Sequence, residues 1–257
     1  MRRLLQHPFV RRHLSLSAIL RALRQPVFLT ALLAFVSLWG FAEIADAIDE
    51  QGTQRFDEWV LKSLRDTTNP NELVGPPWVE QALRDITALG GQTVLTLVTV
   101  IVCVYLSLAG RRDLSLFTAA AVIGGTIVMF ALKDVFHRPR PELVPHILVT
   151  VSSHSFPSGH AMGSAIVYLT LGTMLAEAAE TWRLKAYVLT VAVVLMLLVG
   201  STRVFLGVHY PTDVLAGWAA GFVWAFGCRT VVRLSRFWWH YQKASSARAD
   251  GPSAQRE

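Results

Sequence analysis

Long apolar stretches interrupt the chain at intervals, and each is close to the length needed to cross a lipid bilayer. About 20 apolar residues in a helix span the roughly 30 Å of hydrocarbon in a membrane, and helices satisfy their backbone hydrogen bonds internally. Six stretches approach or reach this length: 27–48, 93–109, 114–132, 159–179, 186–204 and 213–232. The pattern therefore predicts an all-α, polytopic membrane helix bundle with six transmembrane helices.

The longest polar excursion, residues 49–92, contains an amphipathic stretch at 55–66. Four apolar side chains recur there at helical spacing: Phe56, Trp59, Val60 and Leu64. This periodicity predicts a helical segment that lies along the outer surface and covers the site. We expect it to act as a structural brace, with a lid function as the alternative. Trp78 is placed like an interfacial anchor.

The composition agrees with a membrane protein. Of the 257 residues, 53% are hydrophobic and only 16% are charged, against about 25% charged residues in an average soluble domain. The two cysteines, Cys103 and Cys228, fall inside predicted spans, so we expect small packing residues and no disulfide. No repeat or linker divides the chain, and residues 27–235 are expected to form one transmembrane domain.

The two ends of the chain are polar. Residues 1–26 hold six Arg and no acid, which is typical of a cytoplasmic orientation tail. An interfacial helix on anionic lipid and an organellar transit peptide are the alternatives. The stretch 27–48 is too long for the apolar core of a signal peptide, so we expect it to be retained. Residues 236–257 are interpreted as a cytoplasmic tail, disordered over 245–257.

The distribution of Lys and Arg predicts the orientation. Six spans place both termini on one side, together with the loops around Arg111 and Arg183, and that side carries most of the basic residues. Because basic residues favour the cytoplasmic side, both termini are expected in the cytoplasm of a bacterium, with the protein in its inner membrane. The net charge of +6 then reflects topology, and no nucleic-acid partner is expected.

Three polar clusters, 133–141, 157–160 and 202–213, lie at the ends of predicted spans and share the opposite, periplasmic face. Charged groups at the ends of membrane spans cost free energy, and such groups often mark a functional site. Together they supply three cations, a hydroxyl beside an open backbone, and two imidazoles: Lys133, Arg140, Arg203, Ser158, Gly159, His160 and His209. This set suits one anionic, tetrahedral group.

Local spacing strengthens the interpretation of two clusters. Ser158 is expected at the N-cap of the fourth span, where a helix N-terminus can bind phosphate. His209 and Asp213 are four residues apart beside Pro211, so in a helical first turn the carboxylate could hydrogen-bond one ring nitrogen and leave the other as a nucleophile. Each feature alone also has an ordinary structural explanation. Their occurrence on one face favours a site.

The spacing of these motifs resembles the three-part signature of the type 2 phosphatidic acid phosphatase superfamily. The matching segments are Lys133-x6-Arg140-Pro141, Pro157-Ser158-Gly159-His160 and Thr202-Arg203-x5-His209-x3-Asp213. That family includes bacterial lipid phosphate phosphatases, undecaprenyl-diphosphate phosphatases, glucose-6-phosphatase and vanadium haloperoxidases. One departure is visible, because the family usually has Ser where this chain has Thr202, which puts the fine phosphate geometry in doubt.

The resemblance implies a role for each residue. His209 would attack phosphorus and form a phosphohistidine, Asp213 would hold its tautomer, and His160 would protonate the leaving oxygen. The phosphate oxygens would be held by Lys133, Arg140, Ser158, Gly159 and Arg203. No metal or other cofactor is expected. The neighbours His137, Arg138, His146 and His154 are interpreted as solvated loop residues.

Placement at the membrane surface favours an amphiphilic substrate whose tail remains in lipid. Candidates are undecaprenyl diphosphate, phosphatidic acid and phosphatidylglycerol phosphate. The alternatives are a phosphatase for a soluble ester, a vanadate-dependent haloperoxidase and a non-catalytic transporter of lipid phosphates.

Overall fold

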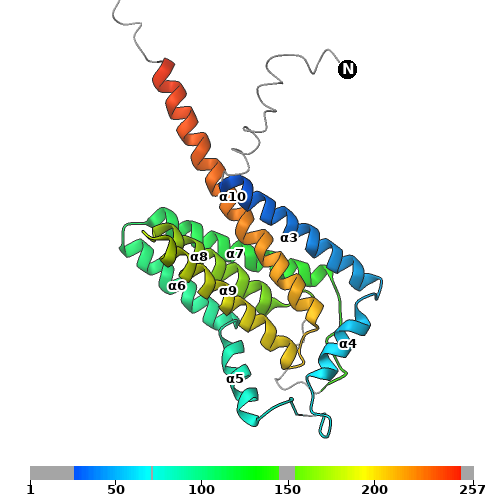
Figure 1. Ribbon diagram of the computed structural model, residues 1–257. Helices are drawn as coiled ribbons and strands as arrows, with labels where there is room; N and C mark the ends of the chain where they lie inside the picture. Colours follow the sequence, from blue (N-terminus) through cyan, green and yellow to red (C-terminus); the bar gives the residue numbers. More distant parts are fainter. Residues whose placement is uncertain (1–25, 71, 145–153, 250–257) are drawn as a thin grey trace, which may run out of the picture. The chain divides into compact units, whose positions relative to one another are not determined.

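The protein is helical throughout the part that the structure describes. The computed structural model describes residues 26–70, 72–144 and 154–249, and within them the side chains of residues 27–70, 72–144 and 154–235 (Figure 1). Its helices are α3 (Pro26–Asp49), α4 (Gln54–Ser63), α5 (Pro77–Ala88), α6 (Gln92–Leu108), α7 (Arg112–Val135), α8 (Gly159–Ala178), α9 (Trp182–Phe205) and α10 (Pro211–Ala249). The only β pairing among these residues is an isolated bridge between Arg65 and Leu73. The predicted all-α class is confirmed.

Five segments are long and apolar enough to cross a membrane: Val27–Asp49, Arg112–Val135, Gly159–Ala178, Trp182–Phe205 and Pro211–Ser235. The remaining predicted span, 93–109, corresponds to α6, which reaches a membrane-spanning length only together with α5, from which it bends by 47°. With 17 residues, α6 alone measures about 26 Å, less than the roughly 30 Å hydrocarbon core. The chain is an integral membrane protein, and the residues that the structure describes contain five or six candidate spans.

The chain divides into two compact units, one of residues 36–225 and one of residues 1–35 with 226–257. All residues of the predicted site lie in the first unit. In the second, the Thr230 hydroxyl donates to the Thr30 hydroxyl at 2.9 Å. Helix α10 continues to Ala249, and the predicted disorder at the end of the C-terminal tail stays a prediction. The interpretation of residues 1–25 lies outside the described residues.

Close packing of α10 on α8 brings the second and third sequence clusters together. A Cβ atom at Gly217 would lie 2.7 Å from the Ser158 carbonyl oxygen, and one at Gly221 would collide with Ala165. Small residues at such spacing let two helices approach closely in a membrane. As a result the two helices begin side by side, and the Ser158 backbone N–H donates to the Asp213 carbonyl at 2.9 Å.

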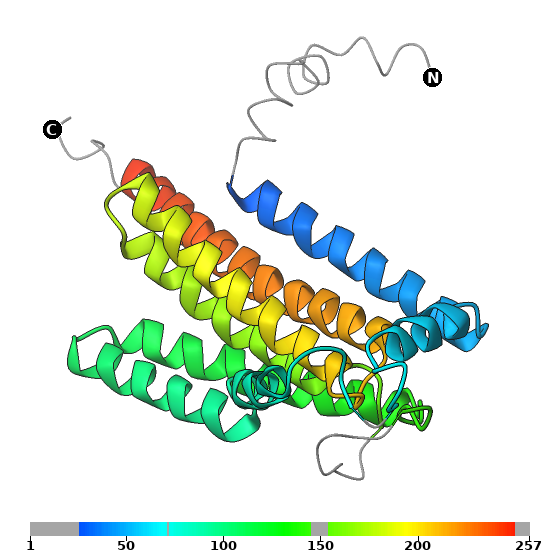
Figure 2. The same ribbon diagram turned by 60° about the horizontal axis from the view of Figure 1, so that its bottom comes forward.

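Helices α8 and α9 lie alongside one another, and α6 and α7 form a hairpin beside them (Figures 1 and 2). Buried residues are concentrated on α8, where 56% of an 18-residue apolar stretch is buried. The site therefore lies at the end of the most enclosed helix.

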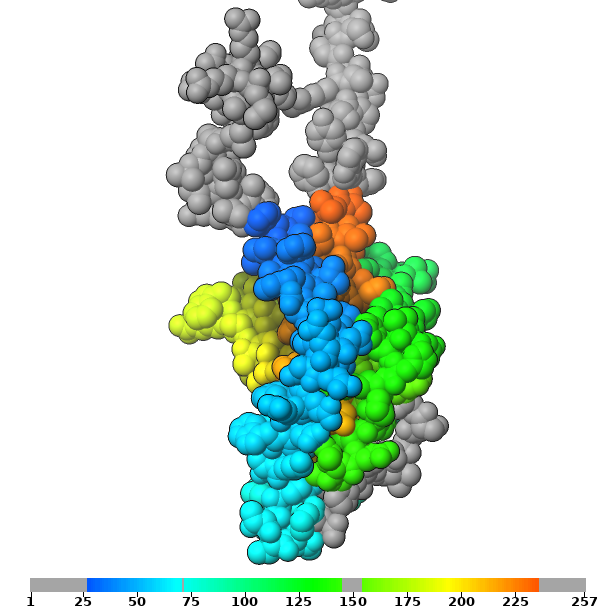
Figure 3. All heavy atoms as spheres, turned by 90° about the vertical axis from the view of Figure 1, so that its right-hand side faces the viewer, coloured from blue at the N-terminus to red at the C-terminus, as the bar shows by residue number. Residues whose placement is uncertain are grey.

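The amphipathic stretch forms α4 as predicted, but with a different buried face. Leu61 is fully buried, and Val60 and Leu64 pack around it. Phe56 is 48% exposed and Trp59 is 67% exposed, so only half of the predicted apolar face is covered by protein. Figure 3 shows the side of the protein on which α4 lies. There the blue-to-cyan segment that contains α4 lies beside the green segment that contains α7.

Cys103 and Cys228 are free and half-buried, and the Cys103 thiol lies 3.6 Å from the Ser115 carbonyl oxygen in the α6–α7 hairpin. Trp78, at the start of α5, is 69% exposed, and its role as an interfacial anchor stays a prediction.

Candidate active site

His209 lies in the short connection between α9 and α10 and is 2% exposed. Its backbone N–H donates to the Arg203 carbonyl at 3.3 Å, which fixes the loop against the end of α9. Burial lowers the pKa of His209 to about 4, although Asp213 counteracts this in part. The imidazole is therefore neutral near pH 7 and keeps a lone pair for attack.

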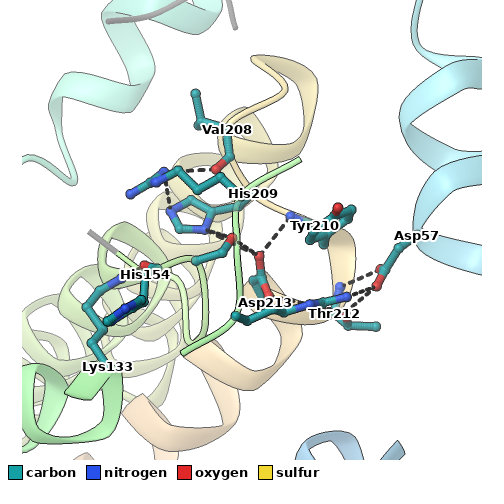
Figure 4. Close-up of polar contacts among 11 residues, drawn as sticks. Asp57, Lys133, His154, Val208, His209, Tyr210, Thr212 and Asp213 are labelled. Carbon is teal, nitrogen blue, oxygen red and sulfur yellow. Dashed lines mark hydrogen bonds and ion pairs between the residues drawn. The ribbon is translucent and has the colours of Figure 1, made fainter. Parts of the chain in front are cut away.

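The two ring nitrogens of His209 face different partners (Figure 4). Nδ1 lies 3.2 Å from the Ser155 hydroxyl and 3.5 Å from Asp213 Oδ2. Nε2 lies 3.4 Å from Arg140 Nη1. The predicted contact between His209 and Asp213 is present, but its 3.5 Å separation is longer than an ordinary hydrogen bond. The Ser155 hydroxyl, which contacts both residues, lies closer to Nδ1.

Asp213, in the first turn of α10, is fully buried and held at both oxygens. Oδ2 accepts from the Ser155 hydroxyl at 2.5 Å and from the Tyr210 backbone N–H at 2.9 Å. Oδ1 accepts from Arg138 Nη1 at 2.7 Å. With this many donors the carboxylate stays ionised and has one orientation.

Arg138 connects Asp213 to the outer helix α4. Its guanidinium also donates to Asp57 Oδ2 at 2.7 Å and to the Thr212 hydroxyl at 2.8 Å, and it lies 4.2 Å above the Tyr210 ring. Burial alone would lower the pKa of Arg138, but the charges of Asp213 and Asp57 outweigh it and raise the pKa. The interpretation of Arg138 as a solvated loop residue is wrong, because its side chain is 13% exposed and bridges two buried carboxylates.

Asp57 completes this connection. It is fully buried, and it accepts from the Thr212 backbone N–H at 3.1 Å and from the Thr212 hydroxyl at 2.6 Å. Helix α4 thus binds the first turn of α10 directly. The contacts agree with the predicted brace, and they show that its anchor is a carboxylate.

The three predicted cations converge on the opposite side of His209. Lys133 interacts electrostatically with Arg140 and Arg203. Each cation also donates a hydrogen bond to the protein. Lys133 Nζ donates to the His154 carbonyl at 2.7 Å, Arg140 Nη1 to the Val208 carbonyl at 2.9 Å, and Arg203 Nη1 to the Thr87 hydroxyl at 2.9 Å. These contacts hold three positive charges near one another, an arrangement that suits an anion.

Two buried polar atoms in this group have no hydrogen-bond partner among the described residues, namely Ser158 Oγ and Arg203 Nε. Ser158 occupies the N-cap of α8 as predicted, but its hydroxyl makes no capping bond. A buried polar atom without a partner costs about 1–3 kcal/mol. A hydroxyl at a helix N-terminus and a guanidinium N–H are both donors that suit the oxygens of a phosphate.

His160 and Gly159 occupy the first turn of α8. Electrostatic interactions link His160 to Arg203, His209, Arg140 and Lys133, so it borders the same space. A Cβ atom at Gly159 would lie 3.4 Å from the Lys133 side chain. The absence of a side chain at Gly159 therefore leaves the lysine close to the helix N-terminus.

The structure brings all eight predicted site residues into one region and adds five that sequence reasoning missed: Asp57, Thr87, Arg138, Ser155 and Thr212. Three of the five had a signal in the sequence: Arg138 and Thr212 lie inside the first and third motifs, and Ser155 lies two residues before Pro157. Nothing in the sequence distinguishes Asp57 or Thr87, which reach the site only through folding.

The other neighbours have more modest environments. His137 is exposed, as predicted, and its ring contacts that of His154 edge-on at 4.5 Å. His154 is half-buried and contributes its carbonyl to Lys133. His146 lies outside the described residues. Within the described ranges, no group of three or more His, Cys, Asp or Glu residues is placed to hold a metal ion.

Comparisons with known proteins agree with this geometry. Residues 114–237 match the PAP2 superfamily. Phosphatidylglycerophosphatase B of Bacillus subtilis (strain 168) is 32% identical over 187 residues, which cover 72% of this chain and 88% of the relative. An undecaprenyl-diphosphatase of the same organism is 28% identical over 115 residues, 43% of this chain and 54% of the relative.

A solved structure shares the fold. The transmembrane PAP2 type phosphatidylglycerolphosphate phosphatase from Bacillus subtilis superposes with a TM-score of 0.70 at 30% identity, covering 78% of this chain and 96% of that protein. The match extends well beyond the three motifs. The chain therefore belongs to the PAP2 superfamily and is a membrane-embedded phosphatase.

Proposed function

We propose that this protein removes phosphate from a membrane lipid through a phosphohistidine formed on His209. The observation that carries the proposal is the arrangement around that residue. A neutral imidazole presents Nε2 to Arg140 at 3.4 Å, beside the buried and unpartnered Ser158 hydroxyl and Arg203 Nε. A nucleophile and a set of anion-binding donors therefore face the same space.

The chemistry needs little beyond this set. Phosphoryl transfer depends chiefly on positioning and on stabilising the negative charge of the equatorial oxygens. Lys133, Arg140 and Arg203 supply the positive charge, with Ser158 and the Gly159 backbone as donors. His160 donates a proton to the leaving oxygen as the P–O bond breaks, and later takes a proton from the water that hydrolyses the phosphohistidine.

An apolar groove beneath these cations supports a lipid substrate. It has a volume of about 450 Å³ and is lined by α6 from Gln92 to Val104, by α7 from Ala119 to Met129 and by α8 at Gly163, Ile166 and Val167. Met129 and Gly163 lie one helical turn from Lys133 and Gly159 respectively, so the groove begins next to the phosphate-binding residues. From Gln92 to Val104, α6 rises about 18 Å, roughly half the thickness of a bilayer.

Two of the threonines that line the groove satisfy their hydroxyls within the protein. The hydroxyls of Thr99 and Thr126 donate to carbonyls of their own helices, at 2.7 Å and 2.9 Å. These two hydroxyls therefore need no partner from a ligand, which suits a hydrocarbon chain. Among the candidates, phosphatidylglycerol phosphate and undecaprenyl diphosphate correspond to the named activities of the similar proteins, and phosphatidic acid shares the same phosphate.

A phosphate-release panel tests the proposal. Purified protein in lipid nanodiscs is given the three lipid phosphates, a short-chain phosphatidic acid and glucose 6-phosphate, with and without chelator. We expect release from a lipid phosphate, retained in chelator, and little release from the sugar phosphate. Equal turnover of the sugar phosphate would contradict a lipid substrate, and loss of activity with chelator would contradict the metal-free mechanism.

Two variants locate the nucleophile. His209→Ala is expected to abolish release, whereas His137→Ala, the matched change at an exposed histidine near the site, should retain it. Labelled phosphate should remain on wild-type protein denatured in alkali, where phosphohistidine survives, and should be absent from His209→Ala. Wild-type turnover by His209→Ala would overturn the assignment.

The proposed location is the periplasmic side of a bacterial inner membrane, with both termini in the cytoplasm. The distribution of basic residues supports it. Gln81, on α5, and Glu180, between α8 and α9, are both exposed. A membrane-impermeant maleimide applied to spheroplasts should label Gln81→Cys and spare Glu180→Cys. The reverse labelling would invert the topology.

A further inference from the structure

The hydroxyl of Ser155 lies between the nucleophile and its carboxylate. It is 3.2 Å from His209 Nδ1 and 2.5 Å from Asp213 Oδ2, and the residue is fully buried. The geometry points to Ser155 as a positioning residue that carries the hydrogen bond from His209 to Asp213. This role rests on the proposed function, because it concerns the imidazole that attacks phosphorus.

The distances decide where the protons lie. A separation of 2.5 Å between the Ser155 hydroxyl and a carboxylate oxygen is typical of a charge-assisted O–H···O⁻ bond, so the hydroxyl proton points to Asp213. The hydroxyl oxygen then accepts from His209 Nδ1–H. That assignment leaves the lone pair on Nε2, the nitrogen beside Arg140.

A direct bond from His209 to Asp213 is the alternative, and two observations oppose it. The 3.5 Å separation is longer than an ordinary N–H···O bond. In addition, Asp213 Oδ2 already accepts from the Tyr210 backbone N–H at 2.9 Å as well as from Ser155. Ser155 therefore offers the Nδ1 proton the nearer acceptor.

The surroundings hold the Ser155 hydroxyl in place. The Ser155 backbone N–H donates to the Arg138 carbonyl at 2.8 Å, and the guanidinium of the same arginine binds Asp213. The next residue, Phe156, is 1% exposed and packs on Phe136 and Phe41 with ring centroids 4.9 Å and 5.7 Å away. Arg138 thus holds both Ser155 and Asp213 in place, which preorganises the hydrogen bond between them.

The attack needs no proton transfer through Ser155. The Nε2 lone pair forms the bond to phosphorus while the bond to the leaving oxygen breaks, and that oxygen takes its proton from His160. Nδ1 keeps its proton, so the ring becomes a phosphorylated imidazolium. Its positive charge is balanced by Asp213 through the Ser155 hydroxyl, which remains neutral.

Ser155 does not belong to the phosphate-binding set. It contacts Nδ1, whereas phosphorus bonds to Nε2 on the other side of the ring. Loss of its hydroxyl should therefore slow the chemical step and leave phosphate binding unchanged. This separates it from Ser158, whose loss should weaken phosphate binding.

Ser155→Ala is compared with Ser164→Ala, a change at a fully buried serine on α8 whose hydroxyl donates only to its own helix, at Ala161 O. We expect kcat of Ser155→Ala to fall about 100-fold, less than the roughly 10⁴-fold loss seen when a catalytic histidine loses its tautomer completely. KM and inhibition by inorganic phosphate should change by less than about twofold. Ser164→Ala should match wild type in all three measurements.

The tautomer itself gives a second measurement that does not need turnover. In protein labelled with ¹⁵N-histidine, with His209→Asn used for assignment, wild-type Nδ1 should carry the proton and Ser155→Ala should show mixed tautomers. An unchanged tautomer with unchanged kcat would overturn the role, and a parallel loss of phosphate inhibition would move Ser155 into the binding set. If wild-type protein releases no phosphate from any ester, the proposed function fails while the tautomer measurement still decides the position of Ser155.

Discussion

The two sides of His209 satisfy their polar atoms in opposite ways. On the nucleophile side, Asp213, Ser155, Arg138 and Asp57 are bonded to one another by distances of 2.5–2.7 Å. On the phosphate side, formed by Lys133, Arg140, Ser158 and Arg203, two buried atoms have no partner within the described residues. Protein contacts thus complete the first side, whereas the second keeps binding capacity for an anion.

The two sides of His209 contribute differently to stability and to activity. A saturated network holds the nucleophile in one geometry and contributes to folding. Buried donors without a partner lower the stability of the free protein, and binding of a phosphate to them restores it. Substitutions on the two sides should therefore have different signatures.

The largest expected effect on activity lies on the phosphate side. Arg203→Ala removes a cation and the unpartnered Nε, so kcat/KM for the lipid phosphate should fall about 10³-fold, as for other preorganised donors to a transition state. Inhibition by vanadate should weaken in parallel. Arg84→Ala, which removes an exposed arginine from α5, is the control. A fall in kcat/KM with unchanged vanadate inhibition would contradict a binding role.

The largest expected effect on stability lies on the nucleophile side. Asp57→Ala leaves Arg138 Nη2 and the Thr212 backbone N–H without their acceptor, and breaking one half of a buried ion pair costs about 3–5 kcal/mol. Thermal unfolding in detergent should show it. The double variant with Arg138→Met should lose less than the two single variants together. Glu58→Ala, at the neighbouring residue whose side chain pairs with Lys62 on the helix surface, should be near neutral.

Ser158→Ala sharpens the contrast between the two sides. It deletes a buried hydroxyl that has no partner among the described residues. The free energy of unfolding of the free enzyme should therefore stay the same or rise by up to about 1 kcal/mol. Activity should still fall because a phosphate ligand is lost. A clear loss of stability would mean that the Ser158 hydroxyl is satisfied within the protein.

The smallest expected effect is a shift in pH dependence. Neutral His209 is the reactive form, and burial lowers its pKa to about 4, so kcat/KM should lose the His209 contribution only as the pH falls through about 4. Arg140 also lowers this pKa. Removing its charge in Arg140→Gln should raise the pKa, and the fall should begin at higher pH.

The substrate phosphate titrates identically in both assays, so the difference between the two kcat/KM profiles belongs to the enzyme. A profile for Arg140→Gln that is unchanged in position would show that Arg140 does not act on His209.

Much of the fold followed from local pattern. Apolar length alone predicted α3, α7, α8 and α9 to within a few residues. It did not reveal that α6 continues from α5 through a bend of 47°, because α5 carries charged residues and no apolar run joins the two helices. Gly90, at the break, packs closely against Val199, a contact between residues far apart in the sequence. Local pattern also missed the burial of Asp57, since hydrophobic periodicity assigns a carboxylate to the solvent face of a helix.

By itself the sequence determined the membrane class, the helical fold and the eight residues of the three motifs. Those features depend on local quantities, namely apolar length, residue type and short spacing. Only the tertiary structure decided which partners these residues have: that Ser155 lies between His209 and Asp213, that Arg138 ties Asp213 to Asp57 on α4, and that Ser158 remains unpartnered. Such pairings join residues up to 155 positions apart, and they form because helix packing, and not chain proximity, sets which polar atoms share a buried space.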